Sequence, residues 1–314
     1  MPYYQTELTV APAPPFDFEA TACSSGWMEL LPTTWDKERR ALQRVQRLSD
    51  GAVVLLSLTS NGAIEQPQVS IEVSHGGELT ARQQDEIMDA VKHMLRVDED
   101  FSEFYTLCRE RGERWARVTG GLGRILRSPA VFEDVVKTIC TTNTFWASTR
   151  AMVKRLVQTC GEPYPADPAR RAFPTPAAIA AADPATFAAA VRLGYRTEYV
   201  HTLAQRVASG ELDLEALRDT SIATRDLKKK LLAIKGVGNY AAATLLTLLG
   251  RYDDLPVDSV FREFVAQEYF AEQQPTDKEA QAVYADWGKW KYLAYWFDIW
   301  TASRKRQEAK GDKK

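Results

Sequence analysis

Residues 231–246, "LLAIKGVGNYAAATLL", place Gly236 and Gly238 between two apolar runs that have helical spacing. Glycine adopts the positive φ angles and close backbone approaches that a tight turn between helices requires. The second run begins at this turn, and the first amides of a helix lack intrahelical partners and carry the positive end of its dipole. The stretch therefore predicts a helix–hairpin–helix whose turn can bind a phosphate.

The same glycines also fit G-x-G-x-x-A, a variant of the dinucleotide-binding fingerprint, with Asp258 twenty residues after Gly238 as the ribose-binding acid. That fingerprint needs a buried strand just before the glycines. The preceding residues 224–234, "TRDLKKKLLAI", have three consecutive lysines and helical spacing instead. The sequence therefore favours the hairpin over a nicotinamide oxidoreductase, and a buried strand ending at Lys235 would reverse that preference.

The composition is that of an ordinary globular protein, with 45% hydrophobic and 26% charged residues in 314. The formal net charge of −2 means that any contact with nucleic acid must come from a local basic face. We find no secretory signal, no apolar run near the roughly 20 residues that span a bilayer, and no metal-type pair among the four cysteines. We therefore expect a cytoplasmic protein, acting at the nucleoid or in the nucleus according to the cell type.

The predicted fold class is α+β, with an antiparallel sheet followed by a mostly helical region. Residues 52–73, "AVVLLSLTSNGAIEQPQVSIEV", contain β-branched runs around the hairpin signal Asn61-Gly62. Thr80 is a good cap for the helix that follows, and Ser128-Pro129 predicts the start of a helix that closes at Gly161. The predicted divisions are a flexible N-terminus 1–15, a sheet domain 16–118, a helical domain 119–302 and a frayed basic tail 303–314.

Downstream of the hairpin, "LPVDSVF" at residues 255–261 puts Asp258 at the predicted start of another helix. The simplest interpretation of Asp258 is a helix N-cap. A carboxylate beside a phosphate-binding hairpin has a second possible task, which is to stabilise positive charge developing on a sugar or to orient water against it.

Together these segments resemble the helix–hairpin–helix (HhH-GPD) DNA glycosylase superfamily, over about residues 120–302. The hairpin and "LPVDSVF" carry most of the resemblance. Leu-Gly-Tyr-Arg at 193–196 is similar to 8-oxoguanine DNA glycosylases, whereas "WGKWKYLAYWFDIWT" at 287–301 is similar to the last helix of 3-methyladenine DNA glycosylase II. "TICTTNTFW" at 138–146 looks like the family segment that carries DNA-wedging residues, where Asn143 matches a wedge position and Phe145 and Trp146 are apolar candidates.

Two departures from the family pattern bear on the expected reaction. Bifunctional members carry a nucleophilic lysine where this chain has Tyr240, and a tyrosine cannot form the Schiff base of a β-lyase step. No cysteine follows Cys160, so the resemblance implies no iron–sulfur cluster. It implies no required cofactor, although the hairpin backbone of some members suggests a monovalent cation site.

The resemblance implies a monofunctional DNA glycosylase of base excision repair that flips out a damaged purine of the 3-methyladenine type. The predicted catalytic residue is Asp258, and the predicted DNA-contacting residues are Lys235, Gly236, Val237, Gly238, Asn239 and Asn143. The predicted pocket for the flipped base lies between the two domains and contains Trp27, Tyr240, Trp287 and Trp290. Further aromatics of the last helix, Tyr292, Tyr295 and Trp296, are available, but most of these rings are expected in the core.

The expected partner is double-stranded DNA with a damaged base, bound by a monomer, and no metal site or membrane contact is expected. Two alternatives stay open: an 8-oxoguanine-type glycosylase, and an inactive helix–hairpin–helix DNA-binding protein in which Asp258 is only a cap. A position of Asp258 in an interdomain cleft near the hairpin would favour an enzyme.

Overall fold

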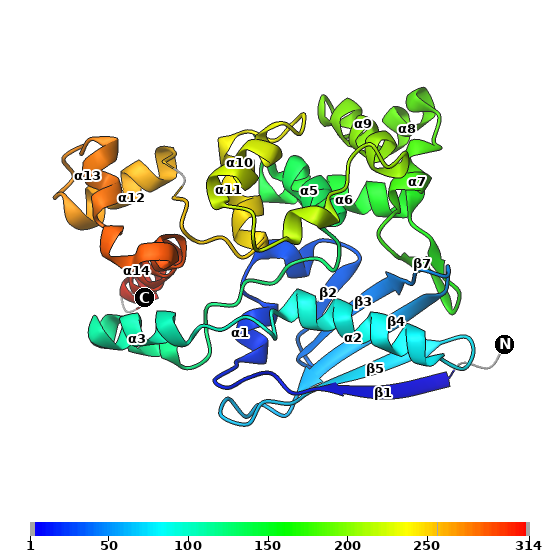
Figure 1. Cartoon of the computed structure of the whole chain (residues 1–314), viewed down its shortest axis with the longest axis horizontal. Helices are drawn as coiled ribbons and strands as arrows, with labels where there is room; N and C mark the ends of the chain where they lie inside the picture. Colours follow the sequence, from blue (N-terminus) through cyan, green and yellow to red (C-terminus); the bar gives the residue numbers. More distant parts are fainter. Residues whose placement is uncertain (1–3, 256, 312–314) are drawn as a thin grey trace.

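An antiparallel sheet forms the first part of the chain in the computed structural model, which describes residues 4–255 and 257–311. Its strands pair in the order β1-β5-β4-β3-β2. They are β1 Tyr4–Val10, β2 Thr33–Asp36, β3 Ala41–Arg47, β4 Val53–Ser60 and β5 Val69–His75. Buried Val69, Ile71 and Val73 alternate with half-buried residues along β5, the period of two of a sheet with one face on the core. Helix α2 (Ala81–Leu95) lies across the sheet (Figure 1).

The prediction of a flexible N-terminus through Pro15 is wrong for residues 4–10. These residues form β1, which pairs with β5 over its whole length, from Tyr4 opposite His75 to Val10 opposite Val69. Termini are ordered when a sheet ties them down, and here the pairing partner lies far along the sequence. The sheet part therefore begins before residue 16.

Helices make up most of the remaining chain. Those of the N-terminal part are α1 Phe18–Ala22, α2, α3 Ser102–Glu110 and α4 Glu113–Ala116, with 3-10 turns η1 Gly26–Glu29 and η2 Arg117–Thr119. Those that follow are α5 Val131–Thr141, α6 Trp146–Cys160, α7 Pro176–Ala180, α8 Pro184–Val191, α9 Arg196–Ala208, α10 Thr224–Leu232, α11 Asn239–Leu248, α12 Ser259–Tyr269, α13 Asp277–Ala282 and α14 Lys291–Gly311, with 3-10 turns η3 Glu215–Arg218 and η4 Ala285–Trp290. The predicted fold class, an antiparallel sheet followed by a helical region, is confirmed.

Local sequence signals predicted some of the helix boundaries and missed others. The predicted cap of α2 is confirmed, because Thr80 and Gln83 form a reciprocal capping box. The single helix predicted from Ser128 to Gly161 is instead two helices, α5 and α6, and α5 begins after Ala130. A short hairpin, β6 Pro163–Tyr164 with β7 Asp167–Arg171, follows α6 and was not predicted.

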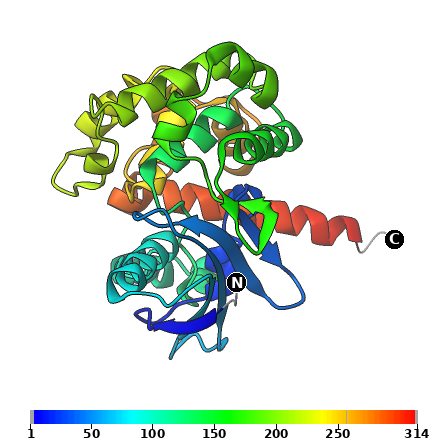
Figure 2. The same ribbon diagram turned by 90° about the vertical axis from the view of Figure 1, so that its right-hand side faces the viewer.

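Helix α14 lies between the two parts of the molecule. In Figure 2 it runs between the sheet below and the green and yellow helices above. The predicted basic tail is helical as far as Gly311, and residues 312–314 lie outside the described residues. None of the helices described is both long and apolar enough to cross a membrane.

Candidate active site

The hairpin of the opening stretch joins α10 to α11. Gly236 has φ +94°, and a Cβ added there would lie 2.6 Å from Cδ2 of Tyr199 on α9. Only glycine satisfies both the backbone angle and the close packing at this corner. A helix and not a buried strand precedes Lys235, so the dinucleotide-binding alternative is wrong.

The outer face of the hairpin is made of backbone and small polar groups. Gly238 caps α11 in an extended conformation, and Gly238 and Asn239 are exposed. Val237 is only 6% exposed, so its side chain packs inward and only its backbone is offered to a ligand. Lys235 Nζ lies 2.6 Å from Glu198 Oε1, and this contact raises the pKa of Lys235. The amide-rich start of α11 is therefore open, with a lysine beside it.

Asp258 lies both at a helix start and at a cavity. It caps α12, because its Oδ1 accepts a 2.8 Å hydrogen bond from Phe261 N. It also lines a cavity of about 640 Å³ that contains Tyr240 from the first turn of α11. Its carboxylate is thus held by a helix terminus at the edge of this cavity.

The walls of this space, which we call the aromatic cavity, come from both parts of the molecule. Among the described residues that line it, Asp258 is the only carboxylate and there is no lysine or arginine. Burial, with the nearby charges of Tyr240 and Asp258, raises the pKa of Tyr292 to about 12. The aromatic residues that line the cavity are Trp27, Trp146, Tyr240, Tyr292, Tyr295 and Trp296.

Trp287 and Trp290, predicted in the base pocket, lie elsewhere. The ring of Trp287 is 4.5 Å from that of Trp115, and the ring of Trp290 is stacked 5.6 Å from that of Tyr252. Gly288, with φ 54°, interrupts the helix between them, so these tryptophans belong to η4 and pack into the core. The cavity residues of α14 recur at helical spacing, a signal that identifies one face: Tyr292, Tyr295, Trp296 and Ile299.

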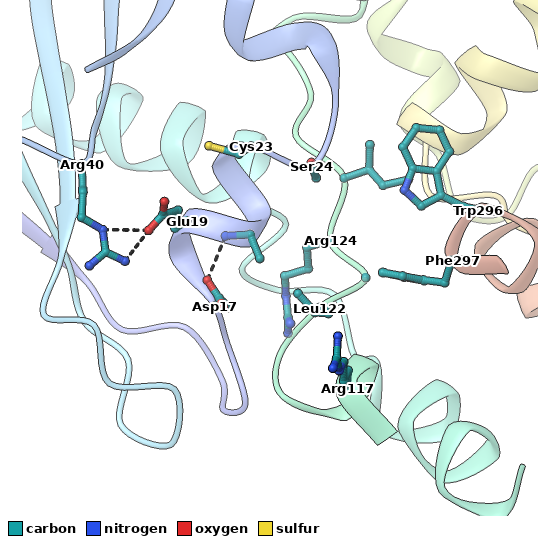
Figure 3. Close-up of a pocket in the computed structure, with 13 residues that line it drawn as sticks. Asp17, Glu19, Cys23, Ser24, Arg40, Arg117, Leu122, Arg124, Trp296 and Phe297 are labelled. Carbon is teal, nitrogen blue, oxygen red and sulfur yellow. Dashed lines mark hydrogen bonds and ion pairs between the residues drawn. The ribbon is translucent and has the colours of Figure 1, made fainter. Parts of the chain in front are cut away.

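A second cavity of about 510 Å³ shares Ile125 and Trp296 with the aromatic cavity. Of its charged side chains, Asp17, Glu19 and Arg40 make contacts within the protein (Figure 3). Arg40 Nε donates to Glu19 at 2.7 Å, and the Asp17 carboxylate caps helix α1. These contacts stabilise the fold, so the aromatic cavity is the candidate site.

Comparison with known proteins agrees with this geometry. Residues 136–289 match the family model of the HhH-GPD superfamily base excision DNA repair protein. This part of the chain is an HhH-GPD domain. The match lies inside the predicted helical domain and includes the hairpin, Asp258 and most of the aromatic cavity. A comparison with curated proteins gave no match.

Solved structures share the fold of nearly the whole chain, HhH-GPD domain and sheet together. The 3-methyladenine DNA glycosylase from Archaeoglobus fulgidus has a TM-score of 0.71 at 18% identity, over 94% of this chain and 98% of that one. The apo 8-oxoguanine glycosylase/lyase from Clostridium acetobutylicum has a TM-score of 0.66 at 16% identity, over 95% and 98%. MBOgg1 in complex with a low-affinity DNA ligand has a TM-score of 0.68 at 20% identity, over 97% and 99%.

The turn between α5 and α6 of the HhH-GPD domain presents the predicted wedge residues. Asn143 has φ 45°, and Arg196 from the Leu-Gly-Tyr-Arg segment donates to the carbonyls of Thr142 and Asn143. Tyr195 stacks on that guanidinium at 4.4 Å, which gives the segment a structural role in holding the turn. Phe145 follows at 86% exposure. The ring of Phe145 therefore lies outside the core.

No group of three or more His, Cys, Asp or Glu side chains among the described residues is arranged to hold a metal ion. The four cysteines are free, and burial raises the pKa of Cys23 to about 11 and those of Cys108 and Cys140 to about 12. These thiols are therefore protonated near neutral pH, and none of them lines the aromatic cavity.

Proposed function

We propose that the protein is a monofunctional DNA glycosylase of base excision repair that acts on damaged purines through Asp258. The observation that carries the proposal is the position of Asp258, fixed by a helix N-terminus at an aromatic cavity next to the hairpin. The family match and the DNA-bound structural neighbour support DNA as the substrate. The proposed form is a monomer that needs no cofactor.

The hairpin would bind one phosphate of the DNA backbone through the first amides of α11, with Lys235 beside them. Such contacts position the duplex without reading its sequence. Because the Lys235 ammonium pairs with Glu198 at 2.6 Å in the free protein, binding would exchange that exposed carboxylate for a phosphate. Affinity would therefore fall as salt concentration rises.

Gly236→Ala is expected to weaken DNA binding and to destabilise the protein by about 1–3 kcal/mol, because alanine would hold a left-handed backbone angle against Tyr199. Gly238→Ala is the matched control for stability, since its added Cβ meets nothing within 4 Å. Urea unfolding and fluorescence anisotropy with a duplex measure both effects. Equal unfolding curves for the two variants would contradict this account of the hairpin.

A base inside a duplex must be flipped out to reach the cavity, at a cost of a few kcal/mol. Phe145 is the side chain best exposed to fill the gap in the stack, next to Asn143 in the same turn. Phe145→Ala is expected to lower the single-turnover rate of base release about tenfold, because part of the flipping cost is no longer offset. Tyr4→Ala removes another exposed aromatic, 49% exposed and on the distant β1, and should not change the rate. A Phe145→Ala rate equal to that of the wild type would assign the wedge to another residue.

At the sugar, Asp258 would stabilise the oxocarbenium-like transition state and direct water to the anomeric carbon. Its cap bond engages Oδ1, which leaves Oδ2 for this task. Tyr240 lines the cavity where bifunctional relatives carry lysine, and the described cavity lining offers no amine to form a Schiff base. The expected product is therefore an abasic site with an intact strand.

The cavity favours an alkylated purine as the base. Its walls are aromatic, and a cationic ring such as 3-methyladenine or 7-methylguanine stacks well on indole and phenol faces. A cationic base also leaves without a general acid, which agrees with a single carboxylate at the site. The 8-oxoguanine glycosylase/lyase from Clostridium acetobutylicum, which has the same fold, keeps that lesion as the second candidate.

Base release from a panel of duplexes tests the proposal. The panel contains 3-methyladenine, 7-methylguanine, hypoxanthine, 8-oxoguanine or uracil, and alkali is added afterwards to reveal abasic sites. Release of alkylated purine with strand breakage only after alkali is expected. Release of 8-oxoguanine alone would select the second candidate, and breakage without alkali would overturn the monofunctional assignment. DNA binding without release from any duplex would leave a binding protein.

A further inference from the structure

Trp27 reaches from the sheet part of the molecule to helix α5 of the helical part. It lies in η1 and lines the aromatic cavity at 7% exposure. Its Nε1 donates to Asp134 Oδ1, on the first turn of α5, at 2.7 Å. The same oxygen accepts a 2.9 Å bond from Ser128 N. Asp134 is therefore a buried carboxylate of the helical part that binds the indole of Trp27 from the sheet part.

Trp146 makes the reverse contact. It is the first residue of α6 in the HhH-GPD domain, and it also lines the aromatic cavity. Its Nε1 donates to Glu29 Oε2, at the end of η1, at 2.9 Å. Arg150 Nη1 binds the same oxygen at 3.1 Å, and the Glu29 side chain is 39% exposed.

Residues 24–29, which carry Trp27 and Glu29, fit closely against the helical part of the molecule. A Cβ added to Gly26 would lie 2.2 Å from Cζ2 of Trp146, so the indole rests directly on the glycine backbone. Ser24 Oγ accepts a 2.8 Å bond from Leu126 N, in the irregular segment that precedes α5. Residues 24–29 are thus seated by backbone packing as well as by the two indole bonds.

The two bonds cross the same interface in opposite directions. The sheet part supplies Trp27 to the cavity and the helical part supplies Trp146, and each part also supplies the carboxylate that holds this tryptophan of the other part. A buried indole N–H needs a partner, and the position of that partner fixes the rotation of the ring. The spacing of these two cavity walls is consequently set by how the parts dock, and not by either part alone.

We propose that Glu29 and Asp134 are positioning residues that act through Trp146 and Trp27 and set how tightly the cavity holds a flipped base. The part of this inference that concerns the flipped base rests on the proposed glycosylase function. A base held loosely spends less time in the reactive geometry, and displacement by about 1 Å can lower a rate by about a hundredfold. Damaged bases that bind chiefly by stacking depend most on this spacing.

Glu29 gives the cleaner test, because its exposed side chain can be changed without leaving a buried charge. Glu29→Ala removes the acceptor of Trp146, and Glu29→Gln restores an acceptor. Glu162→Ala is the matched control, since Glu162 Oε2 also pairs with an arginine across the two parts, Arg47 Nε at 2.6 Å, and lies outside the aromatic cavity. The midpoints of thermal unfolding of Glu29→Ala and Glu162→Ala should be similar.

The first readout needs no substrate. Tryptophan emission and its quenching by acrylamide are measured for each variant, and Trp146→Phe identifies the contribution of that ring. Glu29→Ala is expected to shift the emission to longer wavelength and to increase quenching, while Glu29→Gln and Glu162→Ala resemble the wild type. Spectra of Glu29→Ala and Glu162→Ala that coincide would overturn the positioning role, whether or not the protein is a glycosylase.

The second readout is the single-turnover rate on the lesion that the wild type releases fastest. We expect Glu29→Ala to lower it about tenfold, with the Gln variant recovering most of the rate and the Glu162 control unchanged. A shifted spectrum with an unchanged rate would overturn only the effect on the flipped base. If the wild type releases no base, the proposed function fails while the spectra still decide the positioning role.

Discussion

Asp258→Asn is expected to lower the single-turnover rate of base release at least about a hundredfold, with the fold and the DNA affinity kept. The charge is the reason, because an amide cannot stabilise a positive sugar as a carboxylate does. Asparagine still accepts a hydrogen bond at a helix N-cap, so the bond from Phe261 N to this side chain survives. The rate is measured by quench and alkali treatment with enzyme in excess, alongside anisotropy with an uncleaved duplex.

Asp254→Asn is the matched control, because it neutralises a carboxylate only a few residues before Asp258. Asp254 is engaged by Lys228, whose Nζ lies 2.7 Å from its Oδ2, and it is not among the residues that line the aromatic cavity. Its neutralisation should leave the rate within about twofold of the wild type, because this half-buried carboxylate does not face the cavity. Equal rates for Asp258→Asn and the wild type would return Asp258 to the role of a cap.

The hairpin and its acid were predictable because their chemistry is local. Two glycines at fixed spacing dictate the corner, and Asp258 follows at the start of the next helix, so the sequence alone identified both. The sheet was predictable from its β-branched runs. Strand β1 was not, because its order depends on pairing with β5 some sixty residues later.

The walls of the aromatic cavity were only partly predictable. Trp27 and Tyr240 do line it, whereas the aromatic-rich end of the chain misled. A helical pattern continued from α14 back past Gly288 places Trp287 and Trp290 on the cavity face. The backbone of Gly288 breaks the helix, so this placement is wrong. Periodicity identifies a face only within one uninterrupted helix.

The carboxylates that hold the interface carry no sequence signal. Glu133 and Asp134 look like ordinary acids in the first turn of a helix, where the dipole favours them. Their partners Arg44 and Trp27 are 89 and 107 positions away. Such contacts follow from the docking of two parts, which one sequence does not reveal.

Glu133→Gln is expected to destabilise the protein by about 3–5 kcal/mol, the largest effect that we expect on folding. Arg44 on β3 binds both Glu133 oxygens, with Nη1–Oε1 at 2.9 Å and Nη2–Oε2 at 2.6 Å, and Lys137 Nζ lies 2.7 Å from Oε1. All three side chains are at most 3% exposed. A neutral glutamine would leave two buried cations side by side without the carboxylate that binds them both.

Lys137→Met is the matched control, because it removes one cation and leaves the Arg44–Glu133 pair neutral. Burial lowers the pKa of Lys137, so its charge is already disfavoured, and methionine of similar length should cost far less than the loss of Glu133. Urea unfolding at pH 7 compares the variants. A larger loss for Lys137→Met than for Glu133→Gln would contradict the view that Glu133 neutralises the cluster.

The pH dependence gives the same prediction a second measurement. Burial would raise the pKa of Glu133, but the charges of Arg44 and Lys137 outweigh it and lower the pKa to about 2. The pKa of a glutamate in an unfolded chain is about 4.3. The folded pKa is the lower one, so the stabilisation by Glu133 is complete above the unfolded value and is lost as pH falls towards about 2. The difference in unfolding free energy between wild type and Glu133→Gln should therefore be constant from pH 7 to pH 6 and shrink between pH 5 and pH 3, and a difference that grows over that acidic range would reverse the sign of the argument.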